Sequence, residues 1–165
     1  MVVAEVRMAH RVAGLPQVRV SASMRAEQPT PIVRALVPES GIAEFLGGAF
    51  GEMSSVVRAQ GLRPEGTPFG CYVPAPGGLQ VEAGFPTNTR VEPAGRVVPS
   101  TLPTGPAIQV PHQGPYSAVP AACRAAEAWL VDHRWIATGP PWETYLDGPD
   151  VAEPRTLVHV PCRPA

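Results

Sequence analysis

The stretch Gly66-Thr67-Pro68-Phe69-Gly70-Cys71-Tyr72 decides the fold, because a similar stretch follows it at an offset of 73 residues, from Gly66 to Gly139. The second stretch is Gly139-Pro140-Pro141-Trp142-Glu143-Thr144-Tyr145. The same offset places Gly41 on Gly114, each just before a segment whose apolar residues have helical spacing. A glycine, an aromatic residue, a Gly-x-Pro turn and an apolar stripe recur together, and this indicates an internal repeat.

Each half of the repeat reads as two strands, a helix and two strands. Helices are expected over residues 42–60 and 117–133. Strands are expected over residues 18–24, 32–37, 69–73, 79–85, 96–102, 107–112, 142–146 and 156–160. We therefore predict an α+β fold of two β-β-α-β-β halves, about 17–87 and 96–162, related by a pseudo-twofold axis, with the helices on one face of an antiparallel-rich sheet. The halves form a single domain over 17–165, after an N-terminal extension over 1–16.

The composition and net charge of the chain argue against several classes of function. The chain has 165 residues, of which 44% are hydrophobic and 16% charged, with a net charge of −1. A nucleic-acid-binding domain normally carries a basic excess, so we expect no direct nucleic-acid partner. No apolar run is long enough to cross a membrane. Charged residues scattered through the first 16 positions break a secretory signal pattern, so the sequence predicts a cytoplasmic protein.

The cysteines and histidines do not suggest a metal or cofactor site. Cys71, Cys123 and Cys162 lie far apart and form no Cys-x-x-Cys motif, so neither a disulfide framework nor a zinc site is expected. His112 has no second histidine or cysteine close to it in sequence. No glycine-rich phosphate loop is present. We expect no cofactor and no metal.

Several motifs in order resemble the GyrI-like domain family, which is also the effector-binding domain of multidrug-sensing transcription regulators. They are His112-Gln113-Gly114-Pro115-Tyr116, then Trp129-Leu130, then the segment from Gly139 to Asp147, with Val81-Glu82-Ala83-Gly84-Phe85-Pro86 in the first half. The resemblance covers roughly residues 17 to 162. It implies a pseudo-twofold sheet with both helices on one face and a ligand cleft on the other, between the halves.

The resemblance also implies a function. The family binds bulky, often aromatic or cationic small molecules, and some stand-alone members resemble hydrolases that open strained rings with a pocket Glu. About 16 residues precede the resembling segment, too few for a helix-turn-helix, so the sequence predicts the stand-alone form. The position that matches Glu143 in the first half is Gly70, so a central carboxylate would come from one half only.

Glu143 is the leading candidate for a ligand contact. In a strand, alternate residues share a face, so Glu143 and Tyr145 should lie together, and Trp142 and Thr144 should lie on the opposite face. The apolar and aromatic neighbours favour a carboxylate in an aromatic-lined cleft. The alternative is a solvated residue of an edge strand.

Five further residues complete the candidate site. Glu82 should lie on the cleft side as a second carboxylate, unless that face is simply solvated. Tyr72 and Tyr145, related by the repeat, are candidate walls that stack on an aromatic or cationic ligand, the alternative being buried core tyrosines. Phe69 and Trp142 should face the helices as core residues, although a strand twist could bring them to the rim of the cleft.

Three functions follow. The first is a binding protein for lipophilic, aromatic or cationic compounds, in sensing or sequestration. The second is a hydrolase in which Glu143 is the general base against a strained electrophile. The third is a partner-binding module without a ligand. No second catalytic group is evident, so binding is favoured and enzymatic activity is left open, as is a separate regulatory protein that reads the bound state.

Overall fold

The computed structural model describes residues 6–9, 19–148 and 150–165, with side chains from residue 26 onward. The chain divides into two compact units. One is continuous and runs from Glu27 to Leu102; we call it the inserted unit. The other joins the chain up to Ala26 with Pro103–Ala165; we call it the composite unit. Each unit contains neighbouring antiparallel strands and one long helix.

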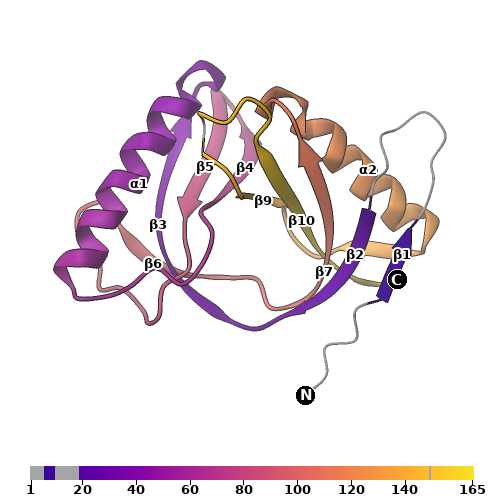
Figure 1. Ribbon diagram of the computed structural model, residues 1–165, viewed down its shortest axis with the longest axis horizontal. Helices are drawn as coiled ribbons and strands as arrows, with labels where there is room; N and C mark the ends of the chain where they lie inside the picture. Colours follow the sequence, from indigo (N-terminus) through magenta and orange to yellow (C-terminus); the bar gives the residue numbers. More distant parts are fainter. Residues whose placement is uncertain (1–5, 10–18, 149) are drawn as a thin grey trace. The chain divides into compact units, whose positions relative to one another are not determined.

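The inserted unit is a four-stranded antiparallel sheet with one helix. Its strands lie in the order β6-β3-β5-β4. They are β3 (Gln28–Val37), β4 (Phe69–Ala75), β5 (Gly78–Gly84) and β6 (Val98–Leu102). A short 3₁₀ turn, η1 (Glu39–Gly41), leads from β3 into α1 (Ile42–Ala59), which lies along β3 and β5 (Figure 1).

The core of the inserted unit lies between α1 and its sheet. Ala49, Met53 and Val57 recur at four-residue spacing on one face of α1 and are buried. This stripe is the amphipathic pattern that a helix needs in order to cover one face of a sheet. They pack on buried residues of the sheet and of the segment after β5: Val33, Ala83, Phe85, Val91 and Val97.

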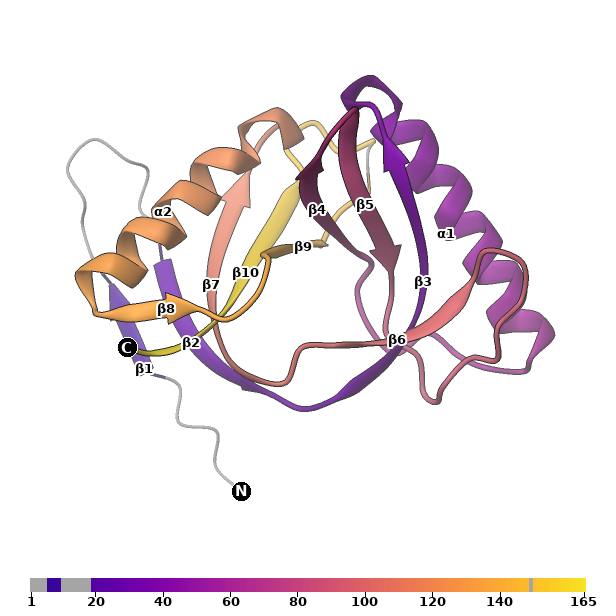
Figure 2. The same cartoon turned by 180° about the vertical axis from the view of Figure 1, so that it is seen from behind.

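The composite unit is a larger antiparallel sheet, also with one helix. Its strands lie in the order β1-β2-β7-β10-β9, and β8 pairs with the far end of β10. They are β1 (Val6–Ala9), β2 (Arg19–Arg25), β7 (Gly105–Gln113), β8 (Trp135–Ala137), β9 (Trp142–Tyr145) and β10 (Arg155–Pro164). The 3₁₀ turn η2 (Tyr116–Ala118) leads into α2 (Val119–Asp132), and β8 follows that helix (Figure 2).

The core of the composite unit lies under α2. It consists of Val119, Ala122, Ala126 and Leu130 of the helix with Ile108, Val110, Val158, Val160 and Cys162 of the sheet. The sheet residues alternate along β7 and β10, as a strand with one face against a helix requires. Every second residue of these two strands therefore points toward α2, and the residues between them point away.

The fold class predicted from the sequence is confirmed. The first half has the predicted β-β-α-β-β order, and the second half has one strand more, β8, directly after its helix. Both helices lie within one or two residues of their expected ranges. Two short strands, β1 and β8, were not predicted. The predicted extension over 1–16 therefore contains a strand that pairs with β2.

The first strand of each predicted half pairs with a strand of the other half. β2 pairs with β7, and β6 pairs with β3. The compact units thus exchange one strand relative to the halves 17–87 and 96–162. Apolar periodicity marks a segment as a strand, but it does not name the neighbour of that strand.

The repeat offset changes along the chain. Pro38 precedes η1 and α1, and Pro115 precedes η2 and α2, each in an extended conformation. Pro38 therefore corresponds to Pro115 in the structure. Gly41 and Ala118, each three residues later, correspond to each other, and the predicted match of Gly41 to Gly114 is wrong. The helix α1 has 18 residues and α2 has 14, a difference of about one helical turn. A shift of one turn preserves the apolar stripe, which is why the sequence pattern concealed it.

Gly84 lies where no side chain fits. A Cβ atom there would lie 2.7 Å from the Pro31 carbonyl oxygen and 2.7 Å from Cζ of Phe69. We expect Gly84→Ala to lower the free energy of unfolding by about 1–3 kcal/mol, because the backbone must move to relieve the overlap. Urea denaturation measures the change. The control is Gly47→Ala in α1, where nothing lies within 4 Å; a stable Gly84→Ala protein would contradict the close packing.

Candidate functional site

Strand pairing places Glu143 on the face of the sheet that α2 covers. In β9, Glu143 lies opposite Val158 and Tyr145 lies opposite Thr156. Residues opposite each other across two strands share a face, and Val158 belongs to the core under α2. Glu143 and Tyr145 therefore share a face, as predicted. That face is the helix side of their unit, where the sequence had placed Trp142 instead.

The carboxylate of Glu143 is half-buried, and it has a nearby phenol as a partner. The Tyr145 hydroxyl donates a hydrogen bond to Oε2 of Glu143 at 3.3 Å. Burial raises the pKa of Glu143 to about 7, although the bond from Tyr145 lowers it in part. Because the charged form loses hydration, the carboxyl changes its protonation state near neutral pH. A group that titrates there can hold a cation or exchange a proton.

Two residues of the helical segment approach the same carboxylate. The ring of Tyr116, in η2, meets that of Tyr145 edge to face with centroids 5.8 Å apart. The pKa of Tyr116 is raised by burial and then by the charges of Asp147 and Glu143. Burial, followed by the charge of Glu143, raises the pKa of the Cys123 thiol of α2 to about 11. We call Glu143, Tyr145, Tyr116 and Cys123 the Glu143 cluster.

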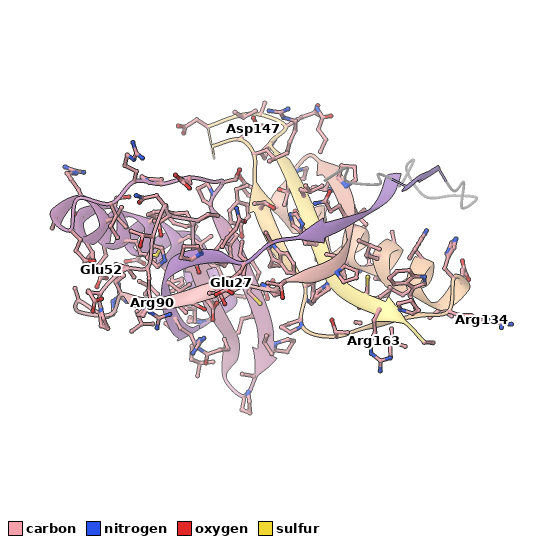
Figure 3. All side chains as sticks on the ribbon, turned by 90° about the horizontal axis from the view of Figure 1, so that it is seen from below. Glu27, Glu52, Arg90, Arg134, Asp147 and Arg163 are labelled. Carbon is pink, nitrogen blue, oxygen red and sulfur yellow. The ribbon has the colours of Figure 1, made fainter. Side chains whose placement is uncertain are left out.

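The loop between β9 and β10 is fixed beside this cluster by one ion pair. Arg155 donates from Nε to Oδ2 of Asp147 at 2.8 Å and from Nη2 to Oδ1 at 2.9 Å. Its backbone N–H also donates to Oδ2 at 2.9 Å. These bonds hold the pKa of Asp147 down at about 2. Figure 3 shows Asp147 on that loop. The ion pair joins Asp147 to Arg155, the first residue of β10, and the charge of Asp147 reaches Tyr116.

Trp142 lies on the face away from α2, which corrects its predicted place against the helix. It pairs with His159, and the two rings stack with centroids 4.9 Å apart and planes 1° apart. Both side chains are buried. Nε2 of the Gln109 amide lies 3.4 Å from Nδ1 of His159, and Thr144 Oγ1 bonds to Nε2 of the same ring. An amide N–H can only donate, so these bonds assign the ring proton to Nε2.

The remaining predicted residues lie in the inserted unit. Tyr72 pairs with Val81, two residues from the core residue Ala83. It therefore lies on the α1 face, which corrects its predicted place on the face away from the helix. Phe69 pairs with Gly84 on the opposite face and is buried, so its predicted place against the helix is wrong. Glu82 lies on that opposite face, as predicted, where Nε of Arg34 donates to it at 3.0 Å.

The predicted site residues thus belong to two units. Glu143, Tyr145 and Trp142 are in the composite unit, and Tyr72, Glu82 and Phe69 are in the inserted unit. Tyr116 and Cys123 were missed as members of the site, although Tyr116 closes the Gly-Pro-Tyr motif quoted above and Cys123 lies on the apolar stripe of its helix. His159 was missed because nothing in the sequence links it to Trp142. Among the described residues, no group of three or more potential metal ligands comes together.

Comparison with known protein families matches residues 29–163 to the GyrI-like small molecule binding domain. The chain belongs to this family. The matched segment contains every residue of the Glu143 cluster. The family is one of small-molecule-binding domains, so small-molecule binding is supported at that general level. Comparison with functionally curated proteins finds no match.

Solved structures support the same fold. The crystal structure of the EcmrR C-terminal domain matches with a TM-score of 0.79 and 23% identity, over 90% of this chain and 99% of that one. EcmrR in its DNA complex matches with a TM-score of 0.78 and 23% identity over 90% of this chain, which spans only 58% of the EcmrR chain. A hydrolase from Listeria innocua matches with a TM-score of 0.69 and 11% identity, over 91% and 94% of the two chains.

A further similar structure contains a ligand. SAV2435 bound to tetraphenylphosphonium matches with a TM-score of 0.61 and 14% identity, over 88% of this chain and 94% of that one. At these identities the comparisons show a shared fold.

In the part of the chain that the structure describes, no helix is both long and apolar enough to span a membrane.

Proposed function

We propose that this GyrI-like domain binds bulky aromatic cations, with Glu143 as the charged contact and Tyr145 and Tyr116 as aromatic contacts. The observation that carries the proposal is a half-buried carboxylate whose hydrogen-bond partner is a phenol rather than a cation. Burying a carboxylate without a positive partner is costly, and a cationic ligand would offset that cost.

The aromatic residues support the same ligand class. A cation held near the face of a tyrosine ring is attracted by the electrons of the ring, and the attraction grows where water is excluded. Two tyrosine rings in edge-to-face contact lie beside Glu143. Tyr72, Glu82 and Phe69 belong to the inserted unit, where Tyr72 and Phe69 lie on opposite faces of the strand and Phe69 is buried, so they are not part of this proposal. Glu82 already has a cationic partner in Arg34, so Glu143 is the better candidate for the charge of the ligand.

Glu143→Gln tests the proposal, because it keeps the shape of the side chain and removes its charge. We expect the affinity for tetraphenylphosphonium at pH 8 to fall by about 1–3 kcal/mol, and the affinity for neutral triphenylphosphine oxide to stay within about twofold. Isothermal titration calorimetry measures both. The affinity of the unmodified protein for the cation should also fall as the pH drops below 7, where Glu143 is protonated.

The matched control is Glu52→Gln. Glu52 of α1 pairs with Arg96 at 2.7 Å in the inserted unit, and its loss removes the same charge from a place outside the Glu143 cluster. If both variants weaken cation binding equally, the effect comes from net charge and the proposed site is wrong. Unchanged binding in Glu143→Gln would also contradict it.

A hydrolase is the second candidate function, favoured by the neutral-range pKa of Glu143. A base with such a pKa can take a proton from water at physiological pH. The resulting hydroxide would attack a ring carbon of a strained electrophile, and the opened oxygen would then take up a proton. Incubation with styrene oxide, followed by mass analysis, separates the two functions. Consumption that falls about 100-fold in Glu143→Gln supports the enzyme, and unchanged styrene oxide supports the binder.

The biological setting is proposed more broadly. We propose a role in sensing or sequestration of such compounds, in the cytoplasm and without direct nucleic-acid contact, with a separate regulatory protein as a partner to be tested. The proposal of no direct nucleic-acid contact is supported by the net charge of −1.

A further inference from the structure

Thr156 of β10 carries a buried hydroxyl that no protein group satisfies. The residue is 1% exposed, and among the described residues its Oγ1 has no hydrogen-bond partner. A buried hydroxyl without a partner is costly, and most such groups in native proteins are satisfied by protein, water or a ligand. Valine has nearly the same shape without this cost, so packing alone does not explain a threonine here.

The register of the sheet places Thr156 beside the Glu143 cluster. Thr156 lies between His112 of β7 and Tyr145 of β9 in one cross-strand row. The next row along the same face contains Val158 and Glu143. Glu143 is therefore a diagonal neighbour of Thr156, and diagonal neighbours have Cβ atoms up to about 7–8 Å apart. A single ligand group can reach both side chains across that separation.

The turn that leads into α2 closes over this row. The ring Nε2 of His112 donates to the carbonyl oxygen of Pro115 at 3.1 Å, which ties the end of β7 to the turn. The next residue, Tyr116, lies against Tyr145. Thr156 thus has a bonded histidine on one side and the tyrosine pair on the other. Thr156 and Glu143 thus share Tyr145 as a neighbour.

We propose that the Thr156 hydroxyl is a second polar contact of the compound that binds at Glu143, and that it donates a hydrogen bond to an oxygen of that compound. The ligand class is therefore an organic cation with an ether, carbonyl or hydroxyl oxygen a few ångström from its charge. This inference rests on the proposed function, because it uses the same site. It adds a requirement that charge and aromatic surface alone do not impose.

Two nearly isosteric cations test the inference. Methoxymethyltriphenylphosphonium has an ether oxygen where n-propyltriphenylphosphonium has a methylene group. The unmodified protein should bind the ether about 3–10-fold more tightly, the range that one neutral hydrogen bond provides. Thr156→Val should abolish this preference while it still binds both cations. Thr156→Ser keeps a hydroxyl and should retain the preference, which separates loss of the hydrogen bond from misfolding.

Thr30→Val is the matched control. Thr30 of β3 is also 1% exposed, and its hydroxyl is likewise without a partner among the described residues, but it lies in the inserted unit. This variant should keep the preference for the ether. Equal binding of the two cations by the unmodified protein, or a preference that survives in Thr156→Val, would overturn the inference. Glu143→Gln should weaken both cations; if it weakens neither, it is the proposed function that fails.

Discussion

Replacing Trp142 by alanine is expected to lower the free energy of unfolding by about 3–5 kcal/mol, the usual cost of removing a buried aromatic side chain. Trp142 is 3% exposed, and its ring stacks on that of His159. The change would leave His159, which is also buried, without its stacking partner. The loss includes the aromatic contact as well as the cavity that the missing ring leaves.

Urea denaturation of the variant measures this loss, and Trp142→Phe is the control. Phenylalanine keeps an aromatic ring against His159 and should recover more than half of the lost stability. An alanine variant within about 1 kcal/mol of the unmodified protein would show that Trp142 lies on an exposed surface. It would also revive the prediction that this residue lines the rim of a ligand site.

The pH dependence of stability should change in Glu143→Gln. The pKa of Glu143 is about 7 in the folded protein and 4.5 ordinarily, so the folded state binds more protons than the unfolded state between these values. Stability therefore falls as the pH rises through this window. Glutamine does not titrate, so the variant does not lose stability in this pH window. The variant should be about 2–3 kcal/mol more stable than the unmodified protein at pH 8, and about equal to it at pH 4.

Denaturant titrations at pH 4, 6 and 8 measure this difference, and Glu52→Gln should behave in the opposite way. Hydrogen bonding to Arg96 lowers the pKa of Glu52, so its charged form stabilises the folded protein. Removing that charge should cost stability at pH 8, where Glu143→Gln gains it. Parallel pH curves for the unmodified protein and Glu143→Gln would show that Glu143 is solvated.

The helices were the most predictable part of the fold. Ala49, Met53 and Val57 lie one turn apart and define the buried face of α1 without any other information. The strand β8 was not predictable, because three residues are too short for a period of two to be seen. The exchange of strands between the two halves could not be predicted either, because no residue of β2 or β6 indicates which strand it pairs with.

The face of Glu143 shows why the site was predicted only in part. Alternation correctly grouped Glu143 with Tyr145. It could not say which group faces α2, because Trp142, on the other face, is also buried. Hydrophobic alternation identifies the inner face of a strand only when the outer face is polar. Tyr116 joins the cluster through a turn that precedes the helix, and such contacts depend on tertiary structure.

The pairing of β2 with β7 has a consequence for the order in which the protein folds during synthesis. All four strands of Glu27–Leu102 are made before β7 begins at Gly105, so this sheet can form while the chain is still being translated. β2 is made earlier than any of them. It can pair with β1, but its other edge waits until the ribosome has passed Gln109. Such an unpaired strand edge can pair with a second nascent chain, so the interval before β7 is made is the stage at which this protein is most exposed to misassembly.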